Sequence, residues 1–352
     1  MNRTVMSTKS MLRNTLMTLG RCVAQWRSAV ASAVVLFLSG QVAYSDIIDM
    51  YVSHVGGVNK YFYDVSTDAI TVDAGFSLLA GSGGLTEPQG LAVGPDNLLY
   101  VVSQDSDQIL RYNRTTGAFV SVVGAPSVPQ DLGFGPDLSG DGVPDLYVAE
   151  FSSGNVVRIP TQGPGAGTVN AFATGLNTVT GMTYGPDGRL YVSSRNLGRI
   201  EKFNETTGAD LGVFATKTNA STALFSPDGS KFYSASTTAT TLSQYDGTTG
   251  ALINGSFGTG LGGPAQATFG PDFNNNGALD IFVANNGSGA TTVSIIDGLD
   301  GGNPLGDAVT GLNRPKDILF IGNIAIPEPG SACLFVIGGL IALGSVRRRV
   351  GH

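Results

Sequence analysis

The sequence predicts an all-β fold, a six-bladed β-propeller, flanked by an N-terminal signal peptide and a C-terminal transmembrane helix. A Pro-Asp turn recurs along the middle of the chain, and short apolar segments surround it in a constant order. Gly accounts for 50 of the 352 residues, about twice the usual share, which indicates many turns. The glycines follow no Gly-X-Y period, which excludes collagen, and the 42% hydrophobic content excludes a disordered chain.

Residues 1–45 have the pattern of a secretory signal. They contain no acidic residue, five basic residues and an apolar run from Ala29 to Leu38. Ala43 and Ser45 place small residues at the two positions that a signal peptidase reads, so we expect cleavage after Ser45. The alternative is a membrane anchor that is never cut, although the apolar run is short for a span.

The middle of the chain is a repeat built around a Gly/Ser-Pro-Asp turn. The aspartates of these turns are 41 to 50 residues apart: Asp96, Asp137, Asp187, Asp228 and Asp272. One short strand is expected before each turn and one directly after it, for example 90–93 and 98–102. A third strand follows a polar loop, as at 108–113, and a fourth follows a Thr-Thr-Gly turn, as at 119–123. Four strands in each repeat of this length are the signature of a propeller blade.

The sixth blade is expected to combine the two ends of the domain. Residues 314–320 match 87–93, but the strands that should follow them are absent. The missing strands lie near the N-terminus instead, at 48–53, 59–64 and 71–79. One blade made from both ends leaves no open sheet edge, so residues 46–326 form one closed domain of six blades.

The repeat resembles NHL-repeat and lactonase-like propellers of the gluconolactonase type, most clearly over residues 180–203. The resemblance covers the whole middle domain and implies the fold rather than a function. An aromatic residue recurs at one strand position, which predicts packing between blades; these residues are Tyr100, Tyr147, Tyr191, Tyr233 and Phe282.

Two of the turns are longer and acidic. The first has Asp137, Ser139, Asp141 and Asp145 at loop positions 1, 3, 5 and 9, and the second has Asp272, Asn274, Asn276 and Asp280. Oxygen ligands at this spacing, with the backbone carbonyl of Val143 or Ala278 at position 7, suit calcium. The loops resemble the calcium loops of FG-GAP-type propellers. The alternative is an ordinary hairpin turn rich in Asn, Asp and Gly. We expect structural calcium, bound more weakly by the second loop because it has two carboxylates.

A ligand site is expected at the rim where each first strand begins. The equivalent strand starts are Gln89, Gln130, Thr180, Ser221, Ala265 and Lys316. The neighbouring loops contribute polar residues: His54, Asp105, Asp107, Glu150, Arg195, Asn196, Asn285 and Asn286. Lactonase-like propellers hold one divalent metal here with Glu, Asn and Asp, and this set is not recognisable in the sequence. We therefore expect no catalytic residue, and His54 is expected to be a solvated loop residue.

The C-terminal region 327–352 resembles the PEP-CTERM sorting signal of exported bacterial proteins. It begins with Pro327-Glu328-Pro329, continues with an apolar stretch and ends with Arg347, Arg348 and Arg349. The apolar stretch is long enough for a transmembrane helix whose arginines mark the cytoplasmic end. The resemblance implies that an exosortase recognises the tripeptide and removes the tail, delivering the domain to the cell surface or an extracellular matrix.

Charge narrows the function classes further. Residues 46–328 keep all 27 acidic residues but only 12 of the 20 basic ones, giving a net charge near −15. Such a surface repels nucleic acid. We expect a surface-displayed binding module whose partners are extracellular polysaccharide or surface proteins. The alternatives are an exported lactonase-like or lyase-like enzyme with a divalent metal at the rim, or a structural matrix component.

Overall fold

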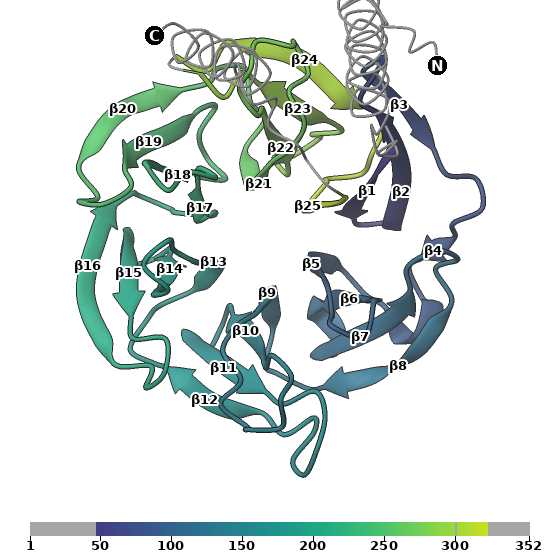
Figure 1. Cartoon of the computed structure of the whole chain (residues 1–352), viewed down its shortest axis with the longest axis vertical. Helices are drawn as coiled ribbons and strands as arrows, with labels where there is room; N and C mark the ends of the chain where they lie inside the picture. Colours follow the sequence, from purple (N-terminus) through teal and green to yellow (C-terminus); the bar gives the residue numbers. More distant parts are fainter. Residues whose placement is uncertain (1–46, 300, 323–352) are drawn as a thin grey trace, which may run out of the picture. The chain divides into compact units, whose positions relative to one another are not determined.

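The computed structural model describes residues 47–299 and 301–322, and these form six β-sheets in a ring around a central axis (Figure 1). The prediction of an all-β, six-bladed propeller is confirmed. The predicted signal peptide, with Ala43 and Ser45, and the predicted sorting signal from Pro327 onward lie outside the described residues. No helix within the described ranges is long and apolar enough to cross a membrane.

Five blades are built from four consecutive strands each, with the first strand nearest the axis (Figure 1). Blade 1 contains β5 (Pro88–Val93), β6 (Leu98–Ser103), β7 (Gln108–Asn113) and β8 (Phe119–Gly124). Blade 2 contains β9 (Pro129–Phe134), β10 (Leu146–Glu150), β11 (Asn155–Ile159) and β12 (Asn170–Ala173). Blade 3 contains β13 (Val179–Tyr184), β14 (Leu190–Ser194), β15 (Arg199–Phe203) and β16 (Asp210–Thr216).

Blade 4 contains β17 (Leu224–Phe225), β18 (Lys231–Ser234), β19 (Leu242–Asp246) and β20 (Leu252–Phe257). Blade 5 contains β21 (Pro264–Phe269), β22 (Ile281–Asn285), β23 (Val293–Ile296) and β24 (Pro304–Val309). Two short 3₁₀ turns, η1 (Ser82–Gly84) and η2 (Gln104–Ser106), flank β5 and β6. The strands follow the predicted segments because the first two strands of blades 1–5 flank a Gly/Ser-Pro-Asp turn. The last two strands of blades 1, 3 and 4 flank a Thr-Thr-Gly turn.

Blade 6 closes the ring with strands from both ends of the domain. Its strand order is β25 (Asp317–Ile321), β1 (Ile47–His54), β2 (Gly57–Asp64) and β3 (Ala69–Val72). β25 pairs antiparallel with β1, from Asp317 opposite Ser53 to Ile321 opposite Asp49. This confirms that the N- and C-terminal strands share one blade.

The predicted fourth strand of blade 6, residues 71–79, is broken in two. β3 ends at Val72, and β4 (Leu78–Leu79) pairs separately with β2. Between them, Asp73 forms an ion pair with Lys60 at 3.1 Å and accepts a hydrogen bond from the backbone N–H of Gly75. This turn brings Phe76 into contact with Tyr51 in the core, which explains why the strand does not continue.

The hydrophobic core consists of six clusters, each between two adjacent blades. In β6, Leu99 and Val101 face the cluster shared with blade 6, whereas Tyr100 and Val102 face the cluster shared with blade 2. This follows from the alternation of side chains along a strand. The recurring aromatic residues are all buried between blades, as predicted: Tyr100, Tyr147, Tyr191, Tyr233 and Phe282.

One residue with a left-handed backbone precedes the innermost strand of every blade. It stands two positions before each rim residue: Glu87, Val128, Thr178, Asn219, Gly263 and Arg314, with φ between 43° and 68°. Only one of the six is Gly, the residue that adopts this conformation without a steric penalty. The chain therefore needs this sharp turn to pass from an outer strand to the axis in all six blades.

Val128 is the β-branched residue for which relief of this strain is easiest to test. We expect Val128→Gly to raise the free energy of unfolding by about 0.5–1 kcal/mol, because removing left-handed strain of ~1–2 kcal/mol outweighs the added backbone entropy of the unfolded chain. Chemical denaturation of the full-length chain measures this. Val122→Gly, on the exposed edge strand β8, is the matched control and should destabilise. A Val128→Gly protein that is less stable than the original would contradict the strain.

Candidate functional site

A polar cavity of about 340 Å³ lies at the end of the ring where the innermost strands begin. The six residues predicted at the strand starts all line it: Gln89, Gln130, Thr180, Ser221, Ala265 and Lys316. They converge because the left-handed residue before each strand directs all six chains to the axis at the same height. The six predicted strand starts therefore lie around one cavity, and ligand binding there stays a prediction.

Three glutamines on one side of the cavity form a closed ring of hydrogen bonds. Gln89 Nε2 donates to Gln104 Oε1 at 3.2 Å, and Gln104 Nε2 donates to Gln130 Oε1 at 2.8 Å. Gln130 Nε2 completes the ring by donating to Gln89 Oε1 at 2.8 Å. Each amide retains a second N–H and a second lone pair, so the ring can still bind hydroxyl or carbonyl groups of a ligand.

The cavity is also lined by charged side chains. Lys316 is 4% exposed and forms an ion pair of 2.7 Å with Glu87. Burial lowers the pKa of Lys316, and the hydrogen bond to Glu87 opposes that shift. Arg195 and Arg314 also line the cavity, and neither has a carboxylate within ion-pair distance among the described residues. The lining thus contains three cationic side chains and two carboxylates, Glu87 and Asp105, in a strongly acidic protein.

Of the predicted loop residues, Asp105, Arg195 and Asn286 line the cavity, and the other five do not. Three of those five accept hydrogen bonds from backbone N–H groups in the connections between strands. Asp107 accepts a hydrogen bond from the backbone N–H of Val128, Glu150 accepts one from Ser127, and Asn285 accepts one from Gly262.

Of the remaining two, Asn196 lies in a loop and His54 at the end of a strand. The side chain of Asn196 donates hydrogen bonds to Asn177 and Thr178. His54 ends β1, and its Nδ1 accepts a hydrogen bond from the backbone N–H of Gly56. Burial lowers its pKa, so the imidazole is neutral. His54 is therefore the last residue of a strand with a partly buried ring, and the expectation of a solvated loop residue is wrong.

Several lining residues were not identified from the sequence: Glu87, Gln104, Val128, Phe151, Ser152, Thr237, Gln266 and Arg314. Glu87, Val128 and Arg314 could have been found, because they stand two positions before a predicted strand start. Gln104, Ser152 and Thr237 lie in loops of unequal length, where the repeat does not align. The Thr237 hydroxyl is buried without a hydrogen-bond partner.

Two buried carboxylates join innermost strands next to the cavity. Asp317 Oδ2 accepts a hydrogen bond of 2.8 Å from the backbone N–H of Leu91, which ties blade 6 to blade 1. Asp131 Oδ2 accepts one of 2.9 Å from Met182, which ties blade 2 to blade 3. Gly90 of blade 1 leaves room for Asp131 of the neighbouring blade, because a Cβ there would lie 3.0 Å from Asp131 Oδ1. Burial raises the pKa of Asp131 to about 6 and that of Asp317 to about 8, and the charge of Asp131 adds to the second shift.

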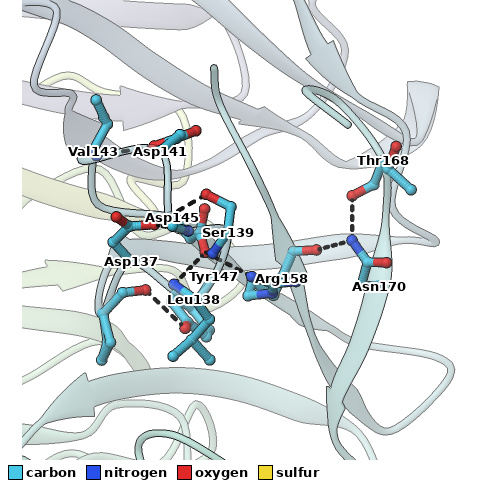
Figure 2. Close-up of polar contacts among 12 residues, drawn as sticks. Asp137, Leu138, Ser139, Asp141, Val143, Asp145, Tyr147, Arg158, Thr168 and Asn170 are labelled. Carbon is cyan, nitrogen blue, oxygen red and sulfur yellow. Dashed lines mark hydrogen bonds and ion pairs between the residues drawn. The ribbon is translucent and has the colours of Figure 1, made fainter. Parts of the chain in front are cut away.

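The first acidic loop, residues 137–145, lies at the other end of the strands, between β9 and β10 (Figure 2). Asp137 accepts hydrogen bonds from the backbone N–H groups of Gly140 and Gly142 and from the hydroxyl of Ser139. Asp145 is fully buried, and its Oδ2 forms a 2.8 Å ion pair with Arg158. Two carboxylate oxygens, Asp141 Oδ2 and Asp145 Oδ1, are buried without a hydrogen-bond partner.

The second acidic loop, residues 272–280, satisfies its own polar groups more completely. Asp272 accepts hydrogen bonds from the N–H groups of Asn276 and Gly277, and Asp280 accepts them from Phe273 and Gly298. The side-chain amides of Asn274 and Asn276 both donate to Asp297. Burial raises the pKa of Asp280 to about 6. Nowhere in residues 47–299 and 301–322 do three or more His, Cys, Asp or Glu side chains form a group that could hold a metal.

Comparison with known proteins supports the fold. No protein-family model matches the chain. Similar solved structures include a proposed 6-phosphogluconolactonase from Bacteroides fragilis (TM-score 0.55, 14% identity, covering 78% of this chain and 98% of that one). One chain of a nidogen–laminin complex has a TM-score of 0.57 at 13% identity, covering 78% of this chain and 98% of that one. A gluconolactonase from Xanthomonas campestris has a TM-score of 0.50 at 17% identity, covering 64% of this chain and 77% of that one. At these identities the likeness establishes a propeller and nothing finer.

The two buried carboxylates predict how stability depends on pH. Because the folded-state pKa values of Asp131 and Asp317 lie above the unfolded value near ~3.9, the folded protein binds more protons than the unfolded chain between about pH 4 and 8. Their contribution to stability therefore falls as pH rises from 6 to 8, by up to about 1.4 kcal/mol per pH unit. Denaturation of the full-length chain at several pH values measures this slope.

Asp317→Asn should flatten the profile between pH 6 and 8, because it removes the group with the higher pKa. Asp210→Asn, which removes an exposed carboxylate, is the control and should leave the slope unchanged. Equal slopes in the original protein and the Asp317→Asn variant would show that Asp317 is already ionised in the folded state at pH 6.

Proposed function

We propose that the axial cavity is the functional site and that it binds a small, hydroxyl-rich anion of the sugar-acid class. The observation that carries the proposal is the lining of the cavity: three cationic side chains stand beside a ring of amides in a protein whose net charge is strongly negative. Amides and hydroxyls bind the hydroxyl groups of a sugar, and a guanidinium binds its carboxylate in two-point geometry. The volume of about 340 Å³ suits a molecule of this size.

Within this site, Arg195 is the cation most available to a ligand. Lys316 is neutralised by Glu87, and Arg314 Nε donates to the side chain of Asn286 at 3.1 Å. The Arg195 side chain has no hydrogen-bond or ion-pair partner among the described residues. A ligand carboxylate at Arg195 would leave the amide ring free to bind hydroxyl groups of the same ligand.

The second candidate is hydrolysis of a lactone of the same class, which two of the similar structures favour by their descriptions as lactonases. The divalent metal expected for that alternative does not fit this cavity. Glu87 is held by Lys316, three cations share the lining, and Asp105 is the one further carboxylate there. Asp105 accepts no hydrogen bond within the described ranges, so it is available to take a proton from an attacking water molecule.

For the two ends of the chain we propose export and surface display. The proposal rests on the basic and apolar pattern of residues 1–45 and on the Pro-Glu-Pro, apolar and triple-Arg order of residues 327–352. Signal peptidase and exosortase would be the processing partners. Extracellular polysaccharide, which is rich in sugar acids, is the source of ligand that this location suggests.

We also propose that the first acidic loop binds calcium as a structural ion. Asp137, Ser139, Asp141 and Asp145 would hold it with the carbonyl of Val143, and the unpartnered Asp141 Oδ2 and Asp145 Oδ1 support this. Binding requires the Asp141 carboxylate to turn toward Asp137, because the three carboxylates do not converge in the structure. The second loop is the weaker candidate, since hydrogen bonds already occupy its carboxylates.

The ligand proposal predicts a preference for anions at the axial cavity. Calorimetric titration of the full-length chain should show that D-gluconate binds at least tenfold more tightly than D-sorbitol, its neutral counterpart. Arg195→Gln should weaken gluconate binding five- to tenfold by removing the carboxylate partner. Lys202→Gln removes the same charge on β15 and should change the affinity less than twofold.

Equal binding of gluconate and sorbitol, or equal effects of Arg195→Gln and Lys202→Gln, would contradict the proposal.

The second candidate, lactone hydrolysis at the axial cavity, is tested with the full-length chain and one further variant. The rate of D-glucono-δ-lactone hydrolysis, measured by proton release with a chelator present, should fall at least tenfold in the Asp105→Asn variant. If gluconate binds but no lactone hydrolysis above background is measured, the cavity is a binding site and the lactonase candidate is refuted.

The calcium proposal predicts a metal site beside Tyr147, whose ring can sensitise terbium luminescence. Titration with terbium should saturate and be reversed by calcium, with a calcium dissociation constant of about 10⁻⁴–10⁻³ M. Asp141→Asn gives the first loop the side chain that the second has at position 5, and should weaken terbium binding at least tenfold. Asp210→Asn is the control for general charge. A signal unchanged by Asp141→Asn would refute calcium at this loop.

A further inference from the structure

A second pocket, of about 350 Å³, opens between blades 4 and 5 at the end of the strands away from the axial cavity. It is lined on one side by the Ser-Pro-Asp turn of blade 4 and on the other by the second acidic loop of blade 5. The walls include Asp228, Tyr233, Gln244, Phe269, Leu279 and Leu299. The residue opposite the recurring aromatic side chain differs between blades: it is Lys202 in blade 3, Ile295 in blade 5 and an arginine in blades 1 and 2.

In blades 1 and 2 an arginine of the third strand stands opposite the recurring tyrosine of the second strand. Arg111 is the register partner of Tyr100, and Arg158 that of Tyr147. The Arg111 guanidinium lies 5.8 Å from the centre of the Tyr100 ring and forms a 3.2 Å ion pair with Asp96 in the turn of its blade. Arg158 forms the corresponding ion pair with Asp145 at 2.8 Å.

Blade 4 keeps the tyrosine and the turn aspartate but lacks the arginine. Gln244 is the register partner of Tyr233, and its Nε2 donates to the Tyr233 hydroxyl at 3.0 Å. Gln244 is shorter than an arginine and neutral, and both Gln244 and Tyr233 line the pocket. The pocket therefore lies beside a position that carries a cation in blades 1, 2 and 3.

The polar groups of the pocket favour a cation. Asp228 Oδ1 accepts hydrogen bonds from the hydroxyls of Ser226 and Ser230, and these bonds lower its pKa, so the carboxylate is ionised. Gln244 Oε1 accepts no hydrogen bond within the described part of the chain. Lys231 also lines the pocket, and Asp246 stands opposite it in the strand register. Phe269, Leu279 and Leu299 add apolar walls.

We propose that this pocket binds a small organic cation with a planar guanidinium or amidinium group and an apolar body. The planar group takes the place of the missing arginine, against the Tyr233 ring and beside the Asp228 carboxylate, where cation–π and ionic attraction combine. The apolar body packs against Phe269 and the two leucines. This site is separate from the axial cavity and does not depend on the function proposed for it.

Benzamidine is the probe, because it joins a planar cation to an apolar ring, and benzamide is its neutral isostere. Titration of the full-length chain should show benzamidine binding at least tenfold more tightly than benzamide. Gln244→Arg should abolish benzamidine binding and raise the melting temperature, because it restores the arginine seen in blades 1 and 2. Equal binding of the two probes would overturn the proposal.

A second pair of variants covers the case in which Gln244→Arg does not fold. Asp228→Asn should weaken benzamidine binding at least fivefold. Asp187→Asn changes the equivalent turn of blade 3, where that carboxylate also accepts a hydrogen bond from the following backbone, and should alter binding less than twofold. Benzamidine binding that survives Asp228→Asn, or that falls equally in both variants, would place the cation elsewhere and refute the site.

Discussion

Each blade is a sheet with two apolar faces, and both faces can be buried only between two neighbouring blades. The six hydrophobic clusters all lie between adjacent blades, so no blade stabilises itself. A chain of six blades that did not close would expose one face at each end. Pairing β25 with β1 removes both exposed faces at once, and every other feature of the molecule depends on this closure.

Closure of the ring determines how the innermost strands are placed around the axis. Six innermost strands must begin at one height, and the sharp left-handed turn before each of them achieves this even where Val128 or Thr178 must adopt it. Neighbouring innermost strands are not paired with one another as a sheet, so side chains join them instead. Asp317 and Asp131 do so with carboxylates that accept backbone N–H groups. The cavity residues stand on this frame, which holds Gln89, Gln130 and Lys316 in place without contributions from long loops.

The sequence revealed the fold because the repeat marks strand ends with residues of known turn chemistry. It also revealed the strand-start residues of the cavity, since equivalent positions in a repeat must meet at the axis. It could not reveal which loop residues face the cavity. Asp105 and Asp107 are equally polar and two residues apart, yet Asp107 turns away to accept the N–H of Val128. Such choices depend on where neighbouring backbone donors lie, and spacing does not encode that. The amide ring was hidden for the same reason, because Gln104 comes from a loop.

Repetition separates structural from functional residues in this molecule. Positions that recur, such as the aromatic residue of the second strand and the left-handed residue before the first, serve ring closure in every blade. Positions that differ between blades are not required for ring closure. The strand starts vary from Gln to Thr, Ser, Ala and Lys, although the backbone there is the same in all six blades. The place of Arg111 and Arg158 is taken by Gln244 in blade 4, although Tyr233 is retained. A ring stabilised by repetition gains distinct sites where the repeat is broken, and the axial cavity and the pocket between blades 4 and 5 both lie at such breaks.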